Sequence, residues 1–88
     1  MKVGGTITGI YDAETFGSFQ KRMFELENDD GHMFAFELHQ DKVSLIDAFS
    51  TDDVVLVFFN IRGRSWHDSE GHKKYFNSLV VWKIKKDE

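Results

Sequence analysis

Hydrophobic and polar residues alternate in three segments of the chain, and this period of two predicts β-strands. The segments are Phe19–Glu27, His32–His39 and Val54–Trp66. A further strand is expected over Lys2–Tyr11, where β-branched residues mix with glycines that let a strand bend. The last strand is expected over Tyr75–Lys85, with Leu79 and Val81 on its inner face.

The segments between these strands carry turn signals, with one exception. Gly17-Ser18, Asp30-Gly31 and Gly71 mark loops, and Asp-Gly is typical of a tight hairpin. In 41–50 the period changes, because Val43, Ile46 and Phe49 are spaced as on a short amphipathic helix.

The resulting order β-β-β-α-β-β predicts an all-β fold with one short helix, a five-stranded OB-fold barrel. A β-sandwich or an SH3-like barrel would accept the same strands, and the helix between the third and fourth strands favours the OB barrel. We expect one domain over residues 1–86 and a short acidic terminus at 87–88. The spacing predicts these core residues: Phe24, Phe34, Phe36, Phe49, Phe59 and Trp82. Leu56 and Phe58 fall on the outward face and indicate a subunit interface or the floor of a groove.

Composition limits the function classes. The 88 residues suffice for one domain, and the absence of cysteine excludes disulfides and cysteine-based zinc sites. The longest apolar run, Val54–Phe59, is far shorter than the ~20 residues of a membrane-spanning helix. The first residues do not resemble an export signal. We therefore expect a cytoplasmic protein with no membrane association.

The formal net charge of −4 argues against nucleic acid as a ligand, but the charges are unevenly distributed. Residues 28–53 hold seven acidic residues against Lys42, whereas residues 54–86 hold seven basic residues against Asp68 and Glu70. A chain of this kind can present one basic face while remaining acidic overall. The alternative is that both regions are ordinary solvated surface.

Three short signatures carry a resemblance to a known family. They are Phe36-Glu37-Leu38-His39-Gln40-Asp41-Lys42, then Val55-x-Val57-x-Phe59-x-Ile61-x-x-Arg64, and finally Trp82-Lys83-Ile84. Together they resemble a family of small bacterial domains of unknown function that is similar to the OB-fold of bacterial and phage single-stranded DNA-binding proteins. His39 departs from the pattern, because that position tends to be tryptophan. The chain also ends at Asp87-Glu88, without the long acidic tail by which such proteins recruit partners.

Cations beside aromatic rings mark the candidate binding residues, since bases stack on rings and phosphates pair with cations. Alternation puts Phe58, Asn60, Arg62, Arg64 and Trp66 on one face of the fourth strand. Lys73, Lys74, Tyr75 and Phe76 lie across the hairpin, and the resemblance extends to this basic-aromatic hairpin. A purely structural alternative is a Trp66–Tyr75 cross-strand pair with solvated arginines.

A second group surrounds the first loop, which lines the binding groove in OB folds. It comprises Phe16, Phe19, Lys21, Arg22 and Met23. These residues could equally pack under the loop or against another subunit.

Other chemistry finds little support. His67, Asp68, Glu70 and His72 lack a recognised metal-ligand spacing, so a polar hairpin loop is the simpler interpretation. No phosphate-binding glycine loop or catalytic triad is evident, and we expect no enzyme activity, no metal and no cofactor.

The sequence thus predicts sequence-tolerant binding of single-stranded DNA, in replication, recombination or phage DNA metabolism, by a homodimer or higher homo-oligomer. Two alternatives stay open: a protein-protein interaction module on an OB scaffold, and RNA binding.

Overall fold

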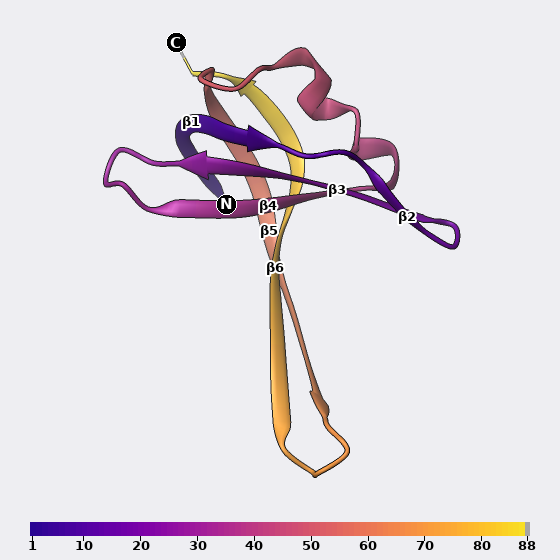
Figure 1. Ribbon diagram of the computed structural model, residues 1–88. Helices are drawn as coiled ribbons and strands as arrows, with labels where there is room; N and C mark the ends of the chain where they lie inside the picture. The colour runs from indigo at the N-terminus through magenta and orange to yellow at the C-terminus, as the bar shows by residue number, and fades with distance from the viewer. Residues whose placement is uncertain (88) are drawn as a thin grey trace.

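Six β-strands and two short 3-10 helices follow one another in the computed structural model, which describes residues 1–87 (Figure 1). The strands are β1 (Lys2–Ile10), β2 (Glu14–Phe16), β3 (Phe19–Glu27), β4 (Met33–His39), β5 (Val54–His67) and β6 (Lys73–Lys86). The 3-10 helices η1 (Gln40–Lys42) and η2 (Leu45–Ala48) occupy the segment where the periodicity predicted one short helix. The short β2, which forms an antiparallel hairpin with the start of β3, was not expected.

The sheet closes on itself through β1. Its first half pairs with β5 and its second half with β3, giving the order β1-β5-β6-β4-β3-β2 with an additional β1–β3 pairing. β4 and β6 are parallel, and the other pairs are antiparallel. Gly5 lies where β1 passes between its two partners, and a Cβ there would overlap the carbonyl of Glu27. The five main strands therefore form a closed barrel in the order predicted for an OB fold.

The barrel interior holds a continuous apolar core. Its buried members are Ile7, Phe24, Leu26, Phe36, Leu38, Ile46, Val55, Val57, Phe59 and Val81. Phe24, Phe36 and Phe59 are buried as predicted, while Phe34 and Phe49 are partly buried and pack against this core. Ile46 comes from η2, so the 3-10 segment contributes a core residue although it is not a regular α-helix.

Trp82 is not a core residue, contrary to the expectation from its spacing. The β5–β6 register shifts at Phe58/Phe59, where Phe58 opposes Lys83 and Phe59 opposes Val81. Val81 is buried, so regular alternation already turns Trp82 outward, and the β-bulge at this point then leaves Lys83 on the same face as Trp82. The Trp82 side chain is 46% exposed and packs against Phe58, with ring centroids 5.4 Å apart.

The distal halves of β5 and β6 leave the barrel as a two-stranded arm (Figure 1). Residues 60–67 and 73–77 form this arm, and their side chains are exposed on both of its faces. The arm lengthens the molecule to 49 Å, against 19 Å in its thinnest direction. Within residues 1–87 there is no helix with the length and apolar character that crossing a membrane requires.

Candidate nucleic-acid interface

One face of the arm collects most of the predicted cationic and aromatic residues. Arg62 lies opposite Ser78, Arg64 opposite Phe76, and Trp66 opposite Lys74. Paired residues in a sheet share a face, and so do residues two apart. The guanidinium carbon of Arg64 lies 5.8 Å from the ring centroids of both Trp66 and Phe76. This side of the arm, called the groove face below, therefore presents aromatic rings with a cation between them.

Two of the predicted residues lie on the other side of the arm. Tyr75 pairs with Ser65 and Lys73 pairs with His67, so alternation directs both away from the groove face. The Lys73 Nζ lies over the Tyr75 ring, 5.6 Å from its centroid. The cross-strand Trp66–Tyr75 pair considered from the sequence does not form, because the true register offsets the two residues by one position.

The residues of the first loop form a second cluster beside the arm. Phe16 on β2 pairs with Phe19 on β3, and the Lys21 Nζ lies 5.8 Å from the Phe16 ring centroid. Phe19 packs edge-on against His39 of β4 at a centroid distance of 4.9 Å. This cluster continues the groove face across β3 and β4.

Arg22 does not belong to this cluster, because its guanidinium is hydrogen-bonded on the other face of β3. Its Nε donates to the Tyr11 carbonyl at 2.7 Å, and its Nη1 donates to Asp47 Oδ1 at 2.7 Å and to the Val43 carbonyl at 3.4 Å. The guanidinium thus ties β3 to the end of β1 and to the 3-10 segment. The structure gives Arg22 a structural task, in contrast to its neighbour Lys21.

A groove of about 420 Å³ runs between the arm and the first-loop cluster. It is lined by Phe19, Lys21, Glu37, His39, Arg62, Gly63, Arg64, Phe76 and Ser78. A second hollow of about 300 Å³ shares Phe19, His39 and Arg62 with it and adds Asn60 and Trp82 among others. The structure therefore brings five of the predicted residues together in one groove and places Asn60 beside them.

Glu37 and His39 form the floor of the groove, and neither was among the binding residues predicted from the sequence. Glu37 is 7% exposed, and its Oε1 lies 2.9 Å from the His39 Nε2. Burial alone would raise the pKa of Glu37, but hydrogen bonding by His39 and Ser78, together with the charge of Lys21, lowers it overall. The ionised carboxylate only accepts, so the Nε2 of His39 is the donor. The sequence did carry a signal for both residues: alternation along β4 places Glu37 and His39 on the outward face of the barrel, together with Lys21.

The two arginines of the groove face are available to a ligand. Neither Arg62 nor Arg64 makes an ion pair within residues 1–87, and Trp66 is 46% exposed. Lys74 lies nearer the tip of the arm, with its Nζ 3.9 Å from Asp68 Oδ2. A binding groove needs exposed rings and cations without carboxylate partners. The arm meets both conditions within residues 1–87, because Trp66 and Phe76 are exposed and the two arginines make no ion pair.

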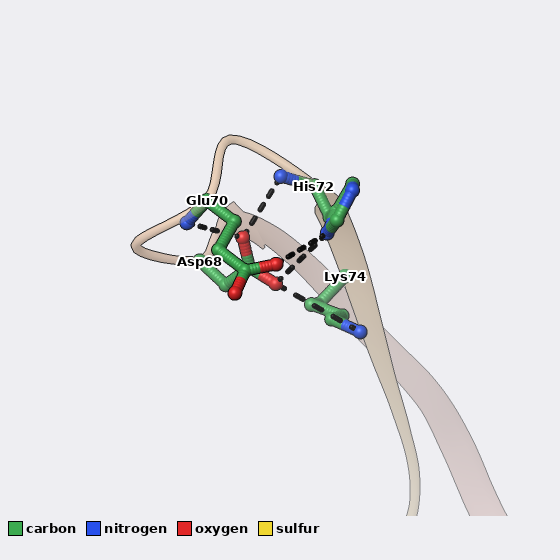
Figure 2. A network of polar contacts seen from close by, with 4 residues as sticks. All are labelled: Asp68, Glu70, His72 and Lys74. Carbon is green, nitrogen blue, oxygen red and sulfur yellow. Dashed lines mark hydrogen bonds and ion pairs between the residues drawn. The ribbon is translucent and has the colours of Figure 1, made fainter.

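The tip of the arm is held by hydrogen bonds from its own backbone (Figure 2). Asp68 Oδ1 accepts from the backbone amides of Glu70 and His72 at 2.9 and 2.8 Å. The His72 Nδ1 lies 3.6 Å from Asp68 and 3.7 Å from Glu70. No group of three or more potential metal ligands occurs in the described part of the chain. The cluster is thus a turn in which a carboxylate caps the backbone.

This barrel order, with the 3-10 segment between the third and fourth main strands, defines an OB fold. The fold is similar to that of the second single-stranded DNA-binding protein of Mycobacterium smegmatis, with a TM-score of 0.70, 14% identity, and 99% and 84% of the two chains covered. It is also similar to the Saccharomyces cerevisiae mitochondrial single-stranded DNA-binding protein Rim1, with a TM-score of 0.67, 12% identity, and 98% and 89% coverage. For the Plasmodium falciparum SSB in complex with single-stranded DNA, the TM-score is 0.58, identity is 16%, and coverage is 97% and 89%.

The chain belongs to the DUF3127 family, described as a domain of unknown function, whose family model matches residues 2–85. The resemblance inferred from the sequence is thereby confirmed, both in the family and in its OB-fold neighbours. A sequence comparison with curated proteins finds no match.

Proposed function

We propose that this protein binds single-stranded DNA, without catalysing a reaction on it, in the groove between the arm and the first loop. One observation carries the proposal: Arg62 and Arg64 line the groove without ion pairs within residues 1–87, beside the exposed rings of Phe76 and Trp66. Flat rings accept bases of any sequence, and cations neutralise phosphates. The structural neighbours from Mycobacterium smegmatis, Saccharomyces cerevisiae and Plasmodium falciparum are single-stranded DNA-binding proteins, and this supports the same proposal.

The proposed contact residues follow the groove face. They are Phe16, Phe19, Lys21, Phe58, Asn60, Arg62, Arg64, Trp66, Lys74 and Phe76. Lys73 and Tyr75 are left out because they lie on the other side of the arm, and Arg22 because its guanidinium is already occupied. The ionised carboxylate of Glu37 on the floor repels phosphates, and the charge of Lys21 is nearby. We therefore propose that the phosphates follow the rims of the groove while the bases face its floor.

The test is a fluorescence anisotropy titration of labelled oligo-dT at low salt, on matched pairs of arm variants. Phe76→Ala is expected to lower affinity about tenfold, since stacking contributes about 1–3 kcal/mol per base. Tyr75→Ala removes a neighbouring ring from the opposite face and is expected to leave affinity within about twofold. Arg64→Ala and Lys73→Ala form the corresponding pair for charge. Equal losses within each pair, or no binding by the unmodified protein, would contradict the proposed groove.

RNA is the alternative ligand for the same groove, because OB barrels bind both DNA and RNA. The groove presents rings and cations and no residue set that identifies a sugar. Competition of labelled oligo-dT by unlabelled oligo-U of the same length decides between them. We expect DNA to bind at least as tightly, and a marked preference for oligo-U would reassign the ligand to RNA.

We further propose that the protein works as a homodimer or higher homo-oligomer in DNA metabolism, in the cytoplasm. The supporting feature is the side of the arm away from the groove, where Ile61 and Tyr75 are 54% and 69% exposed. Analytical ultracentrifugation is expected to show association that Ile61→Lys abolishes. A monomeric mass at all concentrations would exclude the oligomer while leaving the DNA-binding proposal intact.

A further inference from the structure

The β-bulge in β6 creates a second cluster of rings and cations on the barrel itself. At a bulge, two residues of one strand oppose a single residue of its partner, and the usual alternation is interrupted. Here Trp82 and Lys83 both approach the ring of Phe58. Regular alternation would have sent one of them to the opposite face of the sheet.

The cations of this cluster lie over the ring of Phe58. The Nζ atoms of Lys83 and Lys85 are 5.3 and 5.9 Å from its centroid. Neither lysine makes an ion pair within the described chain, and Lys2 pairs with Phe58 from the β1 side. An exposed indole flanked by unneutralised ammonium groups has the same composition as the groove face of the arm.

The bulge cluster is connected to the groove. Trp82 lines the hollow of about 300 Å³ that also contains Asn60 and Arg62. Arg62, Phe19 and His39 line this hollow and the larger groove alike. The two hollows are therefore adjacent, and a flexible polymer that leaves the groove past Arg62 comes next to Trp82.

We infer that the bound strand does not end in the groove but continues along β6 to a second stacking platform formed by Phe58, Trp82, Lys83 and Lys85. This inference rests on the proposed binding of single-stranded DNA and adds its path and its minimum length. Charge complementarity favours a polyanion as the occupant: the platform carries two free lysines within residues 1–87 and extends a groove that contains Arg62 and Arg64.

The path predicts a length requirement. Trp66 pairs with Lys74, which precedes Trp82 by eight residues on the same strand, and at about 3.3 Å per residue this separates the two indoles by roughly 26 Å. A stacked strand rises about 3.4 Å per nucleotide, so roughly eight nucleotides span both platforms. This lies within the range of about 4–16 nucleotides per OB fold.

The experiment uses two single-tryptophan variants of the full chain, titrated with dT4 and dT16. Trp66→Phe leaves Trp82 as the reporter on the bulge, and Trp82→Phe leaves Trp66 as the reporter on the arm. We expect dT16 to quench both reporters with the same midpoint, and dT4 to bind more weakly because it cannot reach both platforms. Circular dichroism establishes that each variant folds.

A charge-matched pair of double variants tests the lysines. Lys83→Ala/Lys85→Ala is expected to weaken dT16 binding about tenfold and to reduce its salt dependence by about one to two phosphate contacts. It should leave dT4 binding nearly unchanged. Lys73→Ala/Lys86→Ala removes the same charge from positions off the path and is expected to have little effect.

The outcomes separate this inference from the proposed function. Quenching of Trp66 by dT16 with no response from Trp82 would overturn the extended path while the groove proposal stands. If the fluorescence of neither Trp66 nor Trp82 changes on addition of dT16, and the anisotropy of labelled oligo-dT does not change either, the proposed function would be overturned as well. A change in Trp82 emission with protein concentration, in the absence of DNA, would assign the platform to a second copy of the chain and also overturn the inference.

Discussion

Glu37 is a buried carboxylate on the floor of a groove that we propose binds a polyanion. Its negative charge repels phosphates, yet it also accepts the hydrogen bond that holds the His39 ring in place, and that ring packs against Phe19. Burial opposes the charged form, and hydrogen bonds from His39 and Ser78 with the nearby Lys21 outweigh this effect and lower the pKa of Glu37. We therefore expect stability and ligand affinity to make opposite demands on this residue.

Glu37→Gln is predicted to separate these two demands. At pH 7 the variant should be less stable by about 1–3 kcal/mol, because charge-assisted hydrogen bonds are lost, and should bind oligo-dT several-fold more tightly because the repulsion is removed. Urea unfolding and anisotropy titration measure the two effects. An unchanged affinity would show that the charge of Glu37 does not act on phosphates bound along the rims.

The pH dependence of this difference follows from the direction of the shift. Folding lowers the pKa of Glu37 from its ordinary value of 4.5. Its contribution to stability is fully present above that ordinary value and is lost as the pH falls through the lower folded-state value. Unfolding curves of the unmodified protein and Glu37→Gln should therefore differ at pH 7 and converge as the pH falls below the lowered folded-state pKa. A constant difference over this range would mean that Glu37 stays ionised or that its charge does not matter.

Two hairpins show the same design at the scale of the element. Asn28 Oδ1 accepts from the backbone amides of Asp30 and His32 at 3.1 and 2.9 Å, as Asp68 Oδ1 does from Glu70 and His72 at the arm tip. Gly31 and Gly71 then take positive φ angles of 82° and 84° at matching positions, a conformation that glycine adopts without steric cost. The side-chain oxygen, and not the charge, is the shared requirement of the turn.

Asp68→Ala is predicted to loosen the arm tip, whereas Asp68→Asn should preserve it, because asparagine performs this task in the other hairpin. Hydrogen exchange at the amides of Glu70 and His72 measures the effect and should accelerate only in the alanine variant. Equal exchange in both variants would show that the charge of Asp68, for example toward Lys74, stabilises the tip instead.

Arg22 and Lys21 are adjacent in β3 but serve different ends, since alternation sends them to opposite faces. Arg22→Ala is predicted to destabilise the fold by about 1–3 kcal/mol, because its contacts to two backbone carbonyls and Asp47 are lost. Lys21→Ala should leave stability nearly unchanged and weaken oligo-dT binding severalfold. Thermal unfolding and anisotropy on both variants check the assignment, and a reversed pattern would refute it.

The whole molecule is acidic, so its proposed affinity for DNA depends on where its cations lie. Lys21, Arg62, Arg64 and Lys74 lie along the groove face, and about 0.7 counterions are released per neutralised phosphate of a single strand. For a strand confined to the groove, these four contacts predict that log K falls with log[salt] with a slope of roughly −3, and contacts with Lys83 and Lys85 would make the slope steeper, roughly −4. Titrations at NaCl concentrations from about 50 to about 300 mM measure this slope. A slope near zero would mean that the groove binds an uncharged partner.

The sequence by itself determined the five main strands, their order along the chain and most of the core, because these depend on local alternation and on turn residues such as Gly31 and Gly71. It also placed Arg62, Arg64 and Trp66 on one face, since alternation is a local rule.

What the sequence could not determine depends on pairing between distant strands. The β5–β6 register separates Tyr75 from Trp66, and the bulge opposite Phe58 places Lys83 on the same face as Trp82. The parallel contact of β4 with β6 brings Glu37 and His39 to the floor of the groove. Register and bulges are set by packing across the whole barrel, so only the tertiary structure decides which rings and charges meet.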